Sequence, residues 1–378
     1  MAMRGSLLAT LEELAPFHGE WDALAVRSSR PYCAPAWMLA WWRWVAEDGA
    51  LLRAVVVTDA AQRLIGVAPF WVTGRRTLLP RYGLLGAGLA APIEPLAQPG
   101  AEEEVAGAIA SVLAAARPRA AVVALDGVPE DSPWPELLRK AWPGGRRPSL
   151  SCESSRPVPT VDLGPGGYDE WFAARSSNFR QQMRRRRRRI EERGAELRLP
   201  RTPEEVEARL DAFARLHEAR WVGRGGSAAL DARVEKMLAD AARELSAQGR
   251  FRLWCINSGD RTVSAHIFLA AGEEASYWLG GFDSEWGSHS PALQTLLAAI
   301  EDAFARGERR LDLGPGGQDY KYRLADGESR LDWLLLLPSG PLHPIARGRL
   351  AALRLVRSLF GSLPPPVRER TRRWLQHE

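Results

Sequence analysis

The sequence predicts an α/β protein with a mixed sheet, built from two copies of one unit. Short strand-like runs joined by turns lead into a helix and then one more strand, and this order occurs twice in the 378 residues. Antiparallel hairpins followed by a helix and a strand are typical of mixed sheets. The composition, 46% hydrophobic and 26% charged, is that of a globular chain and excludes a collagen-like or generally disordered one.

The first copy follows a tryptophan-rich helix and contains Val-rich strands bounded by turn residues. In chain order we expect a helix over Pro35–Glu47, strands over Leu51–Thr58, Leu64–Val72 and Thr77–Leu85, a Gly/Pro-rich loop to Gly100, a helix over Glu102–Ala116 and a strand over Ala120–Leu125. The second copy repeats this order. It comprises strands over Arg250–Ile256, Thr262–Ala270 and Ala275–Phe282, a helix over Pro291–Arg306 and a strand over Arg309–Leu313.

Helical segments join the copies, and they suggest the domain boundaries. We expect helices over Asp169–Arg193, Pro203–Trp221 and Asp231–Gln248. The predicted domains are 1–165, an Arg-rich linker helix at 166–200, a second domain at 201–340 and a basic amphipathic tail at 341–378. With about 150 residues per domain, this length fits two to three domains.

Cysteine usage and hydropathy indicate the compartment. Cys33, Cys152 and Cys255 are few and widely spaced, which favours a reducing compartment and indicates no zinc site. The longest apolar runs are shorter than the about 20 residues that a membrane-spanning helix needs. Glu12 and Glu13 interrupt the first apolar stretch, and no signal-peptide pattern follows. We therefore expect a cytoplasmic protein.

Several motifs carry a family resemblance. They are "PAWMLAWWRW", "LIGVAPFWV", "SSNFRQQMRRRRRRIEERGA", "YWLGGFDSEWGSHSPALQTLLAAIEDAFARG" and "LDLGPGGQDYKYRLA". In this order, over roughly residues 15–338, the chain resembles the two-domain GNAT-related acyltransferases of bacterial polysaccharide (cellulose and exopolysaccharide) gene clusters, which are related to the FemABX peptidyltransferases. The resemblance implies tandem GNAT-like domains and acetyl-CoA or another acyl-CoA as co-substrate, with no metal.

The resemblance also implies that coenzyme A phosphates bind where the second-copy helix begins. A helix N-terminus offers free N–H groups and a positive dipole end. The residues of this turn are Gly287, Ser288, Ser290, Pro291 and Ala292, and the alternative is an ordinary capped helix. The first-copy helix begins with three glutamates, Glu102–Glu104, which would repel phosphate. We therefore expect the N-terminal domain to have lost cofactor binding.

The catalytic candidates lie beside this turn. In the related family a Tyr-Lys pair is characteristic, and here it is Tyr320 and Lys321. Tyr320 could protonate the leaving thiolate, and Lys321 could clamp a phosphate or carboxylate; the alternative is a surface turn with a snorkelling lysine. Asp283 is the favoured base, with a turn cap as its alternative role. Other candidate bases are His289, Asp312, Asp319 and, less favoured because strand histidines are usually structural, His266.

The segment from Arg175 to Arg201 holds the basic charge. It has eleven arginines and three glutamates, a net charge of +8 in a chain of +5. Arg184–Arg189 would point all round a helix, so anions or acidic groups must neutralise them. The alternatives are ion pairing within the protein, an anionic ligand bound through Arg180, Arg184 and Arg187, and tRNA.

The tail offers a further surface. Ile345–Phe360 reads as a basic amphipathic helix before Pro364–Pro366, and it either packs on its own domain or contacts an anionic membrane surface, which would make the protein peripheral to the inner membrane.

Three function classes follow. The first is an acyl-CoA-dependent N-acyltransferase acting on an amine of a small molecule, a peptide or an envelope or glycan precursor. The second is a FemABX-like peptidyltransferase that takes its aminoacyl group from tRNA. The third is a non-catalytic scaffold of a polysaccharide-synthesising complex.

Overall fold

Strands from both halves of the chain join one continuous sheet. The computed structural model describes residues 3–73, 78–221 and 229–361. Within this part of the chain, thirteen strands form a mixed sheet in the order β1-β2-β3-β4-β6-β13-β7-β12-β11-β10-β9-β8, and β5 pairs with β3. The order is symmetric about the β13–β7 pair, with five strands on each side. This symmetry confirms the predicted α/β fold with a duplicated unit.

The first half contributes the elements as far as β7. They are β1 (Arg4–Leu8), α1 (Leu11–Leu14), α2 (His18–Arg27), α3 (Pro35–Trp44), β2 (Leu51–Thr58), β3 (Leu64–Val72), β4 (Arg81–Leu84), β5 (Leu96–Ala97), α4 (Glu102–Ala115), β6 (Val122–Pro129), α5 (Trp134–Ala141) and β7 (Ser149–Asp162). Short 3₁₀ turns lie at Ala15–Phe17 (η1) and Pro31–Cys33 (η2).

The second half repeats this succession. It has α6 (Gly167–Ala173), α7 (Ser177–Glu192), β8 (Ala195–Arg198), α8 (Pro203–Trp221), α9 (Ala232–Leu245), β9 (Phe251–Ser258), β10 (Arg261–Ala271), β11 (Glu274–Phe282), the 3₁₀ turn η3 (Ser284–His289), α10 (Pro291–Ala305), β12 (Arg310–Asp312), α11 (Asp319–Tyr322), β13 (Gly327–Leu337) and α12 (His343–Gly361).

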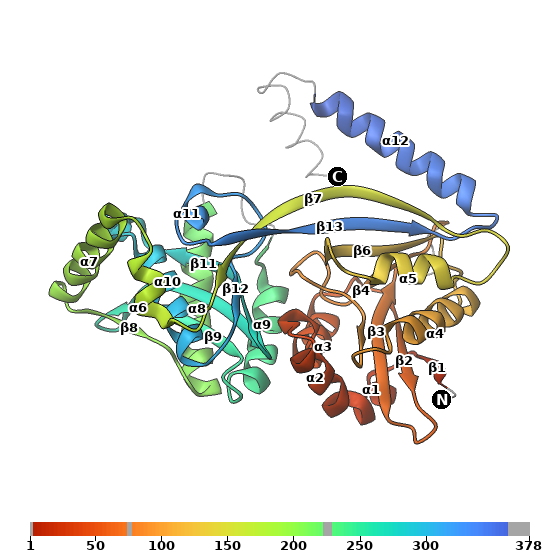
Figure 1. The fold of residues 1–378 in the computed structure, drawn as a ribbon, viewed down its shortest axis with the longest axis horizontal. Coiled ribbons are helices and arrows are strands. Elements are labelled where there is room, and N and C mark those ends of the chain that lie inside the picture. The colour runs from red at the N-terminus through yellow and green to blue at the C-terminus, as the bar shows by residue number, and fades with distance from the viewer. Residues whose placement is uncertain (1–2, 74–77, 222–228, 362–378) are drawn as a thin grey trace.

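The two halves exchange their last strands. β13, the last strand of the second half, pairs with β6 of the first half from Leu331 to Leu336. β7, the last strand of the first half, pairs with β12 of the second half at Thr160–Asp162. β7 and β13 also pair with each other along the length of β13 and run across the whole molecule (Figure 1). Each half therefore completes the other's sheet.

Helices cover both faces of the second-half sheet. One face of β10, with Phe268 and Ala270, packs on α10 together with α6 and α7. The opposite face, with Ala265, Ile267 and Leu269, joins the larger core that includes α8 and α9. α9 also packs on α3 of the first half, where Arg43 and Trp44 donate to the Asp240 carboxylate at 2.9 and 3.2 Å.

Most local elements agree with the sequence, and the differences have physical reasons. The linker helix expected over Asp169–Arg193 is two helices, because the chain turns at Ala174–Ser176 and Ser176 caps α7 by accepting from Phe179 N–H. Thr77, the expected start of the third strand, lies outside the described residues, as does Pro364–Pro366 in the tail. The sequence patterns did not predict the strands β1, β5, β7, β8 and β13 or the helices α1, α2, α5 and α11.

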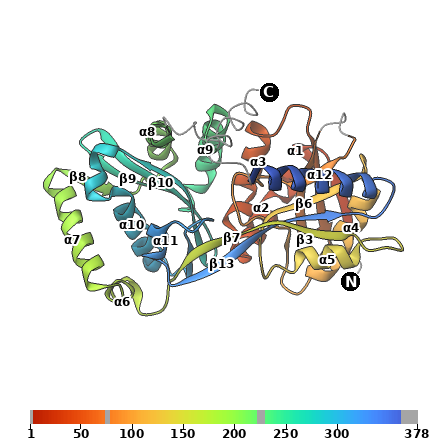
Figure 2. The same ribbon diagram turned by 90° about the horizontal axis from the view of Figure 1, so that it is seen from above.

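The tail forms a helix that lies over the first half (Figure 2). Ala346 and Leu350 of α12 pack on β6 and β13, whereas Leu353, the next residue of the predicted apolar stripe, is 43% exposed. Among the described residues, no helix combines the length and the hydropathy that crossing a bilayer would require.

Candidate active site

The sheet of the second half splits between β11 and β12. These strands run parallel and pair only from Glu274 to Ser276, whose partner is Asp312. Beyond that point the chain after β12 follows β7 instead, with Leu313 N–H bonded to Pro159 O at 3.0 Å and Gly316 N–H to Pro157 O at 2.8 Å. β11 continues to Phe282 without β12 beside it. The result is a wedge, bounded by Tyr277–Phe282 on one side and residues 313–322 on the other, where a strand edge can pair with the amides of a ligand.

A β-bulge marks the mouth of this wedge. Phe268 pairs with Tyr277 while Ile267 pairs with Leu279, so Trp278 is the extra residue of β11. Trp278 contacts the first half: its indole N–H donates to Leu89 O at 2.9 Å, and its ring meets Trp37 edge-on at 5.6 Å. The bulge therefore ties the wedge to the first half of the chain.

Three ring side chains lie close to the wedge: His266 of β10, Tyr277 of β11 and Tyr320 of α11. His266 of β10 is buried, and its Nδ1 lies 3.3 Å from the Tyr277 hydroxyl. Burial lowers the pKa of His266 to about 3, so its ring is neutral at physiological pH and it is a poor base. Burial raises the pKa of Tyr277 and of Tyr320, and the nearby Arg220 of α8 partly offsets both shifts. Both tyrosines are therefore protonated at neutral pH and can donate.

Lys321 binds the backbone of the turn that follows β12, which forms one side of the wedge. Its side chain is buried, and Nζ donates to Gly314 O at 2.8 Å and to Pro315 O at 3.1 Å. Burial lowers its pKa to about 8, although Asp312 opposes this shift. The snorkelling alternative is wrong, because the ammonium points into the protein. The predicted phosphate clamp also has no support from this geometry, since the ammonium already serves the turn that follows β12.

The wedge leads to the N-terminus of α10. Ser290 precedes this helix in the left-handed region (φ 50°), and its side chain makes no capping hydrogen bond. Its hydroxyl instead meets the Arg186 guanidinium of α7. Pro291 is the buried first residue of the helix, Ala292 lies in its first turn, and Gly287 and Ser288 are exposed in η3. The free N–H groups of α10 are thus left beside a cation, an arrangement suited to an anion.

Arg186 and Arg189 of α7, together with Arg193 just after this helix, act on the turn that precedes α10. His289 of this turn is buried, and its Nδ1 has no hydrogen-bond partner. Burial lowers the pKa of His289, and the positive charges of Arg193, Arg189 and Arg186 lower it further. Arg193 also lies over the Trp286 ring, 5.4 Å from its centroid. Within the described part of the chain, no carboxylate lies in ion-pair range of these three arginines. We call Arg186, Arg189, Arg193 and the first turn of α10 the anion cluster.

The arginines expected to bind an anion have other partners. Arg180 donates to Arg175 O at 3.0 Å, Arg184 lies over the Phe172 ring at 5.6 Å, and Arg187 pairs with Glu191 at 2.8 Å. Sequence reasoning missed Arg186. A signal was present, because Phe179, Met183 and Ile190 are the buried residues of α7, and helical spacing places residue 186 on their face.

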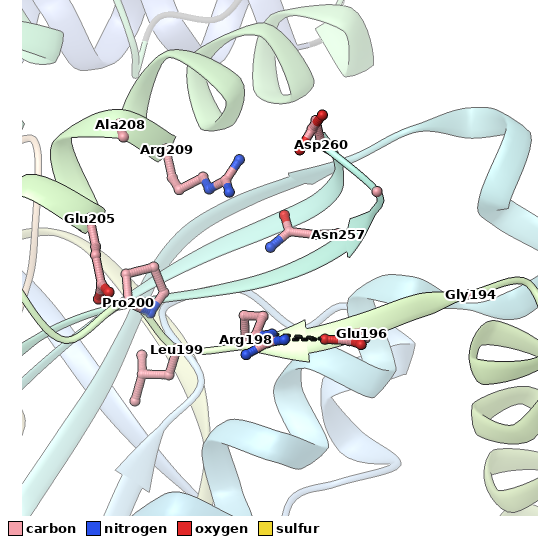
Figure 3. A pocket seen from close by; sticks show the side chains of 11 residues that line it. Gly194, Glu196, Arg198, Leu199, Pro200, Glu205, Ala208, Arg209, Asn257 and Asp260 are labelled. Carbon is pink, nitrogen blue, oxygen red and sulfur yellow. Dashed lines mark hydrogen bonds and ion pairs between the residues drawn. The ribbon is translucent and has the colours of Figure 1, made fainter.

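Asp283 occupies its alternative role. The Asp283 carboxylate caps η3 by accepting from Glu285 N–H at 3.0 Å, and it pairs with Arg261. It closes one end of a groove under α8, formed by two adjoining cavities of about 660 and 580 Å³ that share Ala208, Arg209 and Asp260. Figure 3 shows the far part of this groove, where Arg209 reaches from α8 over the β9–β10 hairpin. Of the other candidates, Asp312 is buried and Asp319 is exposed at the start of α11.

The first-half counterpart of α10 differs in charge. α4 begins after Ala101 without a side-chain cap, and Glu102, Glu103 and Glu104 form its first turn. β4 and β6 repeat the short parallel pairing of β11 and β12, over three residue pairs. The split of the sheet is therefore present in both halves, whereas an anion-attracting helix start is found only at α10 of the two.

Comparison with known protein families gives a match over the part of the chain that contains the candidate site. The family model for the acetyltransferase (GNAT) domain matches residues 177–322, from α7 to α11. This segment is therefore similar to GNAT acetyltransferase domains. It contains the wedge, the anion cluster and the Tyr-Lys pair. A search of curated protein sequences finds no significant match.

Solved structures of similar fold span both halves. FemX is 13% identical with a TM-score of 0.60, and the alignment covers 87% of this chain and 98% of FemX. L-PGS from Bacillus licheniformis is 13% identical with a TM-score of 0.53, over 90% of this chain and 96% of that one. A conserved protein of unknown function from Bacteroides thetaiotaomicron is 11% identical with a TM-score of 0.58, over 88% and 100%. At these identities the likeness concerns the fold.

Proposed function

We propose that the protein is an acyltransferase that uses an acyl-CoA donor and an amine acceptor, the acceptor being a small molecule or an envelope or glycan precursor. The observation that carries the proposal is the continuity between the wedge and the anion cluster. The free edge of β11 can pair with the amide groups of pantetheine, and its end leads directly to an uncapped helix N-terminus lined by arginines, which suits a pyrophosphate.

The chemistry assigns a role to Tyr320. The amine nitrogen bonds to the thioester carbonyl carbon, the C–S bond breaks, the nitrogen loses a proton to solvent and the thiolate gains one. A protonated tyrosine at the wedge can supply that proton, and burial keeps Tyr320 protonated. Tyr320→Phe should lower kcat by about 10²-fold, the lower end of what a general acid supplies, with little change in donor affinity.

Coenzyme A binding tests the donor site directly. In Arg186→Glu a carboxylate replaces the cation beside Ser290, so the Kd for coenzyme A should rise at least tenfold, about 1.4 kcal/mol. Arg188 lies exposed on the same helix, and Arg188→Glu makes the same charge change. It should change the Kd less than twofold. Equal losses in the two variants, measured by calorimetry, would mean that the cluster is not the donor site.

One surface, the exposed arginines of α7, supports aminoacyl-tRNA as an alternative donor. Arg184, Arg185, Arg188 and Arg189 are exposed on α7, and the fold is shared with FemX. If tRNA is the donor, binding should fall steeply with salt and collapse in the triple variant Arg184→Gln/Arg185→Gln/Arg188→Gln. That variant retains Arg186, so under the coenzyme A proposal its coenzyme affinity should stay near that of the parent protein.

A further inference from the structure

A polar cavity lies where the two halves meet, away from the anion cluster. Its volume is about 290 Å³. Arg30, between α2 and η2, and Glu130 and Asp131, after β6, line it from the first half. Glu274 of β11 and Arg310 and Asp312 of β12 line it from the second half. Since a water molecule occupies about 30 Å³ in the liquid, this space suits an organic molecule better than a bare ion.

Two buried carboxyl groups are the unusual feature of this cavity. Glu274 is 6% exposed and Asp312 is 2% exposed. The register pairs Glu274 with Arg310 and Ser276 with Asp312, so both carboxyl groups lie on one face of the sheet. Among the described residues, no basic side chain lies within 4 Å of the Glu274 carboxylate. A nearly buried carboxylate without an ion pair is costly and calls for a cationic partner.

Neither of the two arginines that line the cavity beside these carboxyl groups pairs with them. Arg30 donates from Nε to the Glu94 carboxylate at 2.6 Å. Arg310 donates from Nη2 to the Ser329 hydroxyl at 2.8 Å, while its buried Nε has no hydrogen-bond partner. Asp312 accepts one hydrogen bond, from Gly314 N–H at 2.5 Å. The exposed rim adds Glu130 and Asp131 opposite Arg330. Carboxylates therefore exceed the cations available to pair with them, and the cavity favours positive charge.

We propose that this cavity is a binding site for a small organic cation, a primary ammonium held by Glu274 and Asp312. The site differs from the donor site of the proposed function and does not depend on whether the donor is a coenzyme or a tRNA. Because residues from both halves line it, an occupant would bridge them. Its volume, near the lower limit for small-molecule sites, fits a molecule of the size of a diamine or an amino sugar.

The empty site should hold protons that a cation displaces. Burial, and next the Asp312 charge, raise the pKa of Glu274 to about 7, against the opposing influence of Arg310, Arg30 and the Ser276 hydroxyl. Burial raises the pKa of Asp312 to about 6, opposed by the Gly314 hydrogen bond and by Arg310, Lys321 and Arg30. Tyr32 of η2 also faces both carboxyl groups. A bound ammonium favours their ionised forms, so binding should release protons and strengthen as pH rises from 5.5 to 8.

Calorimetry with 1,4-diaminobutane as the probe and 1,4-butanediol as its uncharged counterpart tests this. The diamine should bind the whole protein and the diol should not. In Glu274→Gln, which keeps the side-chain shape, the Kd for the diamine should rise at least tenfold. Glu273 is exposed and pairs with Arg309 at 3.1 Å, so Glu273→Gln is the matched control and should bind like the parent protein. Titrations in two buffers of different ionisation enthalpy should show proton release.

Equal binding of diamine and diol, or an unchanged diamine Kd in Glu274→Gln, would overturn the proposal. Asp312→Asn provides a second variant should Glu274→Gln melt below the assay temperature, and it should weaken the diamine in the same direction. Coenzyme A titrated into the same variants separates this site from the donor site, because its affinity should not follow that of the diamine.

Discussion

Gly280 shows how one absent side chain shapes the candidate site. It lies on β11 opposite His266, and a Cβ there would be 2.0 Å from His266 Nδ1. His266 fills that space and approaches the Tyr277 hydroxyl. Gly280→Ala must displace the imidazole, so it should destabilise the fold by about 1–3 kcal/mol, as overpacking of a core does.

Gly107 provides the matched control at the residue scale. It lies inside α4, and a Cβ there would meet nothing within 4 Å. Gly107→Ala should therefore raise the free energy of unfolding by up to about 1 kcal/mol, because alanine is the better helix former. Denaturant titrations of both variants measure these values. Equal effects would show that His266 does not need the space at Gly280.

At the scale of elements, the sequence predicted the hairpin strands, whose pairing partners are the next strands along the chain, and it missed strands whose partners are far away in the sequence. The hairpins β2–β3 and β9–β10–β11 consist of consecutive strands, so apolar runs between turns predicted them correctly. β7 is rich in serine, contains two prolines and takes partners from β13 and β12, far along the chain. The six consecutive arginines of α7 show no alternation of polar and apolar residues. Which of them faces α10 can therefore be inferred only from the apolar residues of the same helix, such as Met183.

The bulge of β11 is an element whose role can be measured. Trp278 joins the wedge to Leu89 and Trp37 of the first half. Trp278→Phe keeps an aromatic ring and loses the hydrogen bond, so it should cost about 1 kcal/mol of stability. Trp278→Ala leaves a cavity and should cost about 3–5 kcal/mol. If both variants melt alike, the contact is not what holds the bulge against the first half.

At the scale of the whole molecule, the exchange of β7 and β13 should make unfolding cooperative. β6 lies between β4 of its own half and β13 from the other end of the chain, and β12 lies between β11 of its own half and β7. If the second half unfolds, β6 loses β13 and the backbone groups on that edge are left unpaired. Neither half can therefore keep its complete sheet alone, and calorimetry should show one transition, with a calorimetric enthalpy equal to the van't Hoff enthalpy.

A change in β13 should consequently destabilise both halves together. Leu336 is buried and pairs with Val123 of β6 and Leu150 of β7. Leu336→Ala should lower the single transition without splitting it, since a core leucine contributes about 2–5 kcal/mol. Two resolved transitions, with only one of them shifted, would instead describe independent domains joined by a linker. The wedge lies beside the exchanged strands, so the same coupling would let the first half influence the candidate active site.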